Sequence, residues 1–78
     1  MALLTSALDT PFTPAKGPFN LQVGGTGSAV LERENVSGAG FVPAVRVYAN
    51  TAVTVANDVA GARYKLTGAV GVTVHAYQ

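Results

Sequence analysis

Gly61-Ala-Arg-Tyr-Lys-Leu-Thr-Gly-Ala-Val-Gly-Val-Thr-Val-His-Ala-Tyr77 is the stretch that decides the fold. It contains two runs of alternating side chains, at residues 62–67 and 70–77, with Gly68 between them. Because side chains alternate between the two faces of a β-strand, each run predicts a strand with one dry and one wetter face. Val70 begins the dry face of the second run. Glycine tolerates the backbone angles of a tight turn, so Gly68 predicts a hairpin between the two strands.

Four more segments with this alternation precede the closing pair, at residues 18–23, 28–34, 41–48 and 51–56. The glycine-rich run at 24–27 predicts a hairpin turn between the first two. Within the later three segments we expect these side chains to face inward: Leu31, Val45, Val47, Val53 and Val55. Six short strands with regular turn signals are typical of an antiparallel β-sandwich or small barrel. The sequence therefore predicts an all-β fold, with residues 18–78 as the β domain.

Residues 1–17 are predicted to form an extended N-terminal arm. Residues 2–8 favour one or two helical turns, but Pro11 and Pro14 would end them and bias the segment towards an extended form. Two interpretations stay open: a frayed terminal tail, or an apolar arm that packs on a neighbouring subunit. The segment lacks the basic start and the longer apolar run of a signal peptide, so we expect a soluble chain made in a cytoplasm.

The content of charged residues is low. They make up 12% of the 78 residues, against roughly 25% in ordinary globular domains. Protein can cover such a surface without removing water from many charged groups, so we expect a subunit of an assembly. The chain has no cysteine for a disulfide, and its net charge of +1 comes from scattered basic residues. We expect neither a nucleic acid nor a membrane as a partner, because there is no basic patch and no long apolar run.

Few residues are candidates for chemistry. His75 is the only histidine, and a zinc site or a nucleophilic triad would need further ligands or a carboxylate that the spacing does not offer. Glu32 and Glu34 lie on one face of their predicted strand. A solvated strand face with Arg33 on the opposite side, or a cross-strand partner such as Arg46 or Arg63, explains them better than acid–base catalysis does. We therefore expect no enzyme activity, no catalytic residue, no metal and no cofactor.

The order of several short motifs resembles small virion proteins of tailed bacteriophages. The motifs span residues 17–77 and are Gly17-Pro18-Phe19-Asn20-Leu21, Val30-Leu31-Glu32-Arg33, Phe41-Val42-Pro43, Gly61-Ala62-Arg63-Tyr64-Lys65-Leu66 and Gly68-Ala69-Val70-Gly71-Val72. Proteins of this type are β-rich and similar to capsid decoration (cement) proteins or other small head components. The loop at residues 36–40 departs from the pattern, because Val-Ser-Gly-Ala-Gly replaces an Asp-Gly-Gly turn. The resemblance implies a β fold and an assembly role, and it transfers no catalytic residue.

The leading hypothesis is a non-enzymatic virion subunit that binds and stabilises the capsid shell. Its partners would be the major capsid protein and copies of itself, in a trimer or other small ring, after synthesis in the bacterial cytoplasm. The side chains predicted to contact other subunits are Leu4, Leu8, Phe12, Pro14, Phe41 and Tyr77. Two alternatives stay open: a tail or neck component, and a carbohydrate- or receptor-binding module that uses Thr73, His75 and Tyr77 on one strand face.

Overall fold

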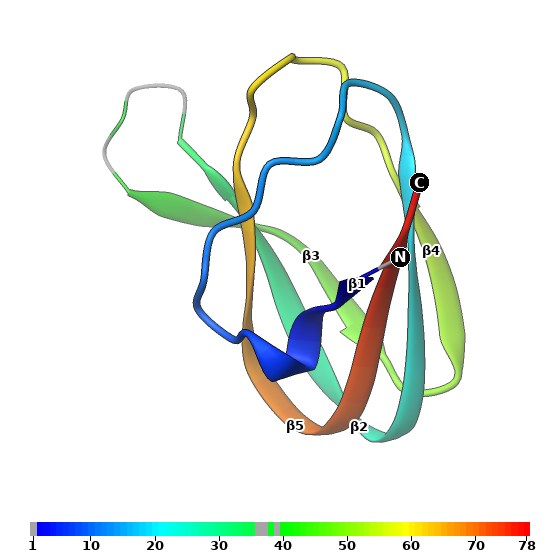
Figure 1. Ribbon diagram of the computed structural model, residues 1–78. Helices are drawn as coiled ribbons and strands as arrows, with labels where there is room; N and C mark the ends of the chain where they lie inside the picture. Colours follow the sequence, from blue (N-terminus) through cyan, green and yellow to red (C-terminus); the bar gives the residue numbers. More distant parts are fainter. Residues whose placement is uncertain (1, 36–37, 39) are drawn as a thin grey trace.

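The computed structural model describes residues 2–35, 38 and 40–78, and five strands form one antiparallel sheet in this part of the chain (Figure 1). Two strands are long: β2 spans Phe19–Glu34 and β5 spans Tyr64–Tyr77. The shorter elements are the strands β1 (Ala2–Leu3), β3 (Phe41–Tyr48) and β4 (Thr51–Val55), and the 3-10 turn η1 (Leu4–Ser6). The prediction of an all-β antiparallel fold is confirmed.

The strands differ from the predicted six, because two predicted turns lie inside strands. β2 continues through residues 24–27, and β5 continues through Gly68, without leaving the sheet. The hairpins predicted at these two positions are therefore wrong. Glycine suits hairpin turns and sharply bent strands for the same conformational reason, so its presence alone does not separate them. Of the predicted loop at 36–40, residues 36, 37 and 39 lie outside the described residues.

β2 is the central strand, and it changes one of its neighbours half-way along. β5 pairs with it from Asn20 to Arg33. On its other side, β4 pairs with residues 19–23 and β3 with residues 28–34. The register between β2 and β5 shifts on both sides of Ser28, which marks bulges that bend both strands at the same level. Figure 1 shows β2 and β5 turning together at the bottom of the view, at what we call the crease, so that the sheet folds into two facing halves.

Glycine is required at the crease because two backbones meet there. A Cβ built on Gly27 would overlap the carbonyl oxygen of Val70, and a Cβ on Gly25 would overlap that of Gly71. Gly25 and Gly71 also have φ angles of 116° and 69°, which residues with side chains rarely adopt. Side chains at these positions would hold the strands apart. The glycines therefore permit the crease, and the crease produces the two halves.

The two halves enclose one hydrophobic core. Phe19 begins β2 and Tyr64 lies opposite Arg33 near its end, yet their ring centroids are 5.2 Å apart in an edge-to-face contact. This contact is possible only because β2 folds back on itself. The other buried core residues are Leu4, Leu21, Val23, Ala29, Leu31, Val47, Val55, Leu66 and Val74.

The predicted inward faces are confirmed, with one exception. Leu31, Val47 and Val55 are buried, and the other two valines of the predicted set are half-buried against the core. Val70 was predicted on a dry face, and this is wrong, because its exposed fraction is 70%. The bulge beside Ser28 breaks the alternation of β5, so side chains before and after it no longer follow one period.

Residues 2–12 lie along the outer edge of β5 of the same chain. β1 pairs with the C-terminal part of that strand. Further along, the backbone N–H of Asp9 donates to the carbonyl oxygen of Leu66 at 2.8 Å, and Phe12 and Tyr64 exchange two backbone hydrogen bonds of 2.8 and 2.9 Å. The arm thus pairs with an edge of the sheet that would otherwise be open to other strands.

A buried asparagine closes the end of the molecule opposite the crease. Asn57 is 1% exposed, its Nδ2 donates to the carbonyl oxygen of Ala15 at 2.9 Å, and its Oδ1 accepts from the Tyr64 hydroxyl at 3.2 Å. Its own carbonyl oxygen accepts from the backbone N–H of Gly17 at 2.9 Å. These bonds offset the cost of burying the amide, and they join the segment before β2 to the loop after β4.

The crease predicts that two glycine substitutions in β2 differ strongly in their effect on the free energy of unfolding. Gly27→Ala places a methyl group against the carbonyl oxygen of Val70, so the free energy of unfolding should fall by about 1–3 kcal/mol or more. Gly24→Ala is the matched control, because a Cβ there meets nothing within 4 Å. Its effect should stay within about 0.5 kcal/mol. Urea unfolding followed by circular dichroism measures both, and equal losses would contradict the steric role of the crease.

Candidate functional site

Folding the sheet at the crease leaves two outer faces, one on each half. Directly opposed residues of an antiparallel pair point to the same side of a sheet, so the register identifies the side chains on each face. The first, which we call the charged face, consists of Val30, Glu32, Glu34, Phe41, Pro43, Arg46, Lys65 and Thr67, with Arg63 beside it. The second, which we call the neutral face, consists of Leu3, Asn20, Gln22, Ala52, Thr54, Thr73, His75 and Tyr77. The charged side chains are thus segregated, because the second set contains no Lys, Arg, Asp or Glu.

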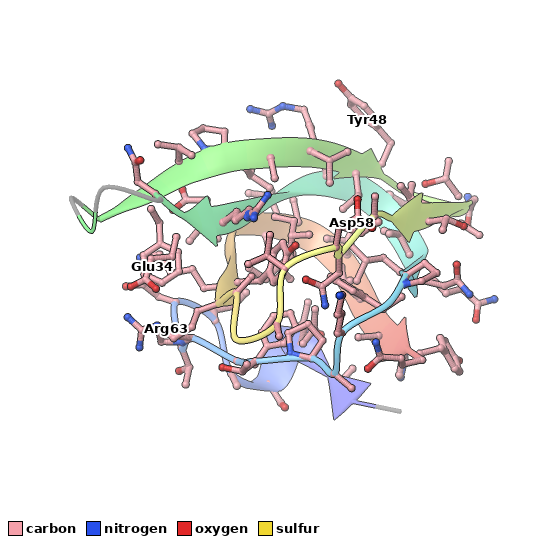
Figure 2. The ribbon with its side chains drawn as sticks, turned by 90° about the horizontal axis from the view of Figure 1, so that it is seen from above. Glu34, Tyr48, Asp58 and Arg63 are labelled. Atoms are coloured by element: carbon pink, nitrogen blue, oxygen red, sulfur yellow. The ribbon has the colours of Figure 1, made fainter. Side chains whose placement is uncertain are left out.

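A two-contact ion pair organises the charged face. The Arg63 guanidinium donates from Nη2 to Glu34 Oε2 at 2.6 Å and from Nε to Glu34 Oε1 at 3.2 Å. Figure 2 shows the two side chains close together, where β2 ends and β5 begins. The hydrogen bond from Arg63 lowers the pKa of the Glu34 carboxyl, and the same pair raises the pKa of Arg63. Arg63 is one of the two partners that the sequence predicts for this pair of glutamates.

Glu32 and Lys65 of the charged face are also engaged. The Glu32 carboxylate accepts a hydrogen bond from Thr67 Oγ1 at 3.1 Å, and Lys65 donates to Asp9 at 2.6 Å. Lys65 Nζ also lies 4.8 Å from the centroid of the Phe41 ring. Glu32 and Glu34 share a face, as predicted, and each carboxylate is bound to a side chain of the same chain, Thr67 for Glu32 and Arg63 for Glu34.

A hollow of about 560 Å³ lies on the neutral face. Polar and aromatic residues from β2, from the turn between β3 and β4, from the start of β4 and from β5 line it: Gln22, Asn50, Thr51, Thr73, His75 and Tyr77. The His75 and Tyr77 rings lie next to each other, with centroids 6.4 Å apart and planes inclined by 38°. The structure therefore brings together the three residues of the predicted strand face and adds amides that the sequence did not point to.

His75 has no carboxylate neighbour on the neutral face. The glutamates lie on the other half of the sheet, so the structure does not assemble a histidine–carboxylate pair around it. Within the described residues, no three His, Cys, Asp or Glu side chains are grouped to hold a metal ion. The neutral face thus offers hydrogen-bonding groups and rings.

Two large apolar side chains are exposed at the crease end of the charged face. Val70 and Tyr48 both lie opposite Ser28, one on each neighbouring strand, and their exposed fractions are 70% and 57%. In Figure 2 the Tyr48 side chain projects away from the sheet. We call this pair, with Ser28 between them, the crease patch. The sequence did not predict it, because the bulge in β5 reverses the side to which Val70 points.

The six side chains predicted to contact other subunits fall into two groups. Leu4 is buried in the chain's own core, and Phe12 is half-buried with its ring centroid 6.2 Å from those of Phe19 and Tyr64. Outside the core cluster lie Leu8, Pro14, Phe41 and Tyr77, which, like Phe12, stay at least partly accessible. Their contacts with other subunits stay predictions.

Comparisons with models of protein families, with characterised proteins and with solved structures find no match. No helix in the described part of the chain has the length and apolar character needed to cross a membrane. The two faces and the crease patch are therefore the features that bear on the function.

The ion pair predicts that the titration midpoint of Glu34 depends on Arg63. Arg63→Gln removes the hydrogen bond that lowers the Glu34 pKa, so the midpoint of Glu34 should rise towards its ordinary value. Because the folded-state pKa is lowered, the stabilisation is present above the unfolded-state pKa and is lost as the pH falls through the folded-state value. The stability difference between wild type and variant should therefore vanish in acid.

NMR titration of the side-chain carboxyl carbons measures the midpoint directly. Arg46→Gln is the matched control, because Arg46 lies opposite Val30 and makes no ion pair within the described residues. An unchanged Glu34 midpoint in Arg63→Gln would show that the ion pair does not persist in solution.

Proposed function

We propose that this protein is a non-enzymatic structural subunit of a tailed-bacteriophage virion, a decoration or cement protein that binds and stabilises the capsid shell. Its partners are the major capsid protein and copies of itself, in a trimer or other small ring. The chain is made in the host cytoplasm and resides in the capsid. The resemblance of its motif order to small virion proteins supports this proposal, and so do the surface properties described above.

The crease patch is the observation that carries the proposal. Val70 and Tyr48 have the two largest exposed fractions among the exposed large hydrophobic side chains of the described residues, and they lie on one row of the sheet. Neighbouring exposed apolar groups are typical of contact sites, and a tyrosine at the centre of an interface commonly contributes much of its energy. A partner surface that covers this row would remove both side chains from water.

The small size of the molecule limits the area of the contact that one subunit can make, so several linked subunits would bind a shell more tightly than one. The accessible surface is 4347 Å², so a standard interface of about 800 Å² per partner would cover roughly a fifth of it. The area of one such contact does not by itself set its affinity. Several subunits joined in a ring bind a lattice much more tightly, because each further contact forms at high effective concentration.

The arrangement of ionisable groups supports a non-enzymatic role. His75 lies on the neutral face, whereas Glu32 and Glu34 lie on the charged face and are bound to Thr67 and Arg63. A histidine base that is oriented by a carboxylate needs the two groups within hydrogen-bond reach of each other, and here they lie on different halves of the sheet. The geometry favours binding over turnover.

The crease patch predicts a specific loss of shell binding. Val70→Asp places a carboxylate in the contact, so the affinity for shells assembled from the coat protein of the same phage should fall at least about tenfold, as expected for an unpaired charge in an interface. Folding should be retained, because Val70 lies outside the core. Co-sedimentation with shells measures binding, and circular dichroism measures folding.

Val59→Asp is the matched control, because Val59 is 52% exposed and belongs to the segment between β4 and β5, which lies at the end opposite the crease (Figure 1). It should bind shells as the wild type does. Wild-type affinity in Val70→Asp would contradict the assigned contact. Immunogold labelling of virions gives the location, and label confined to the tail or neck would replace the head assignment with that of a tail component.

A further inference from the structure

The hollow on the neutral face has free hydrogen-bonding groups. Within the described residues, the side chains of Gln22, Asn50, Thr73 and His75 make no hydrogen bond, whereas Thr51 Oγ1 already donates to the carbonyl oxygen of Tyr48. Four polar side chains from three separate segments thus have hydrogen-bonding groups that no other described residue uses, and they lie in one place. The volume of about 560 Å³ lies within the range of small-molecule sites, roughly 300–1,000 Å³.

The lining excludes the common charged ligands. Phosphates and carboxylates are held by Arg or Lys, and metal ions by several carboxylates, imidazoles or thiolates. The hollow has no Arg, Lys, Asp, Glu or Cys, and His75 is its one imidazole. A fully apolar ligand is also disfavoured, because it would cover the amides and hydroxyls without replacing their bonds to water.

The same lining matches a ligand rich in hydroxyl groups. Amide side chains each donate and accept, as a sugar hydroxyl does, so Gln22 and Asn50 can bond neighbouring hydroxyls of one ring. Tyr77 is 37% exposed, and its ring lies beside that of His75. Exposed aromatic rings give a flat apolar surface for the C–H face of a sugar ring.

We propose that the hollow on the neutral face binds an uncharged hexose unit of a glycan. Tyr77 and His75 pack against the ring, and Gln22, Asn50 and Thr73 bond its hydroxyls. This goes beyond the proposed shell contact, which uses the crease patch on the other half of the sheet, so either site can fail without the other. On a virion subunit, such a site would face away from the patch and bind sugars of the host surface.

The test uses the full chain, ¹⁵N-labelled, titrated by NMR with glucose, galactose, mannose and N-acetylglucosamine to about 100 mM, a concentration that saturates any site with a Kd of about 1 mM or less. Glucuronic acid is the charged comparison. At least one neutral sugar should shift the signals of Gln22, Asn50, Thr73 and His75, and glucuronic acid should shift them less. No shift at these residues with any neutral sugar, or an equal shift with glucuronic acid, would overturn the proposal.

Variants assign the site within the same experiment. Tyr77→Ala should raise the Kd of the sugar that binds wild type by at least about tenfold. Tyr48→Ala is the matched control, because Tyr48 is also exposed but lies in the crease patch, and it should leave binding unchanged. Thr73→Val keeps the side-chain shape and removes one hydroxyl, so it should weaken binding while the fold persists.

Three outcomes would overturn the proposal at this stage. They are equal losses in Tyr77→Ala and Tyr48→Ala, full binding in Thr73→Val, and shifts of the same residues on dilution without sugar. The last would show that a second copy of the chain occupies the neutral face. Shell binding by these variants is measured separately and is independent of the result.

Discussion

The close approach of two backbones at the crease is the constraint on which the rest of the structure depends. Gly25, Gly27 and Gly71 leave no Cβ where β2 and β5 meet, so both long strands can bend together. That bend brings Phe19 onto Tyr64 and lets a chain of 78 residues, which has no cysteine for a disulfide, enclose a core. A small domain buries a limited share of its surface, so a folded sheet with a paired arm is an economical way to cover both sides of its core.

The crease also divides the surface into regions with different properties. One half carries the ion pair of Glu34 and Arg63 and the other half carries amides, hydroxyls and two rings. The engaged charges fix the first half by bonds within the chain, and the free polar groups of the second half remain available to a ligand. The crease patch lies at the crease end of the charged face, whereas Asn57 lies at the opposite end of the molecule. The geometry thus separates the proposed assembly contact from the proposed sugar site on one small sheet.

Alternation predicted what lies within each half, and it failed where the halves join. Leu31 and Val47 face inward as expected, because the period of two holds along an unbroken ladder. Glycine at residues 24–27 and 68 favours a turn and a bend equally, and only the long-range pairing of β2 with β5 decides between them. For the same reason Val70 was placed on the wrong side. Thr73, His75 and Tyr77 could be grouped from one strand alone, whereas Gln22 and Asn50 join them only through the register of other strands.

The most direct test of this account is the pattern of backbone NOEs between strands in the labelled protein. The account predicts contacts from Gln22 to His75 on one side of the crease and from Glu32 to Lys65 on the other, because β2 and β5 pair on both sides. Contacts that join residues 21–23 to residues 28–30, without contacts to β5, would show that the glycine-rich run is a hairpin turn. That result would contradict the crease and, with it, the separation of the two faces.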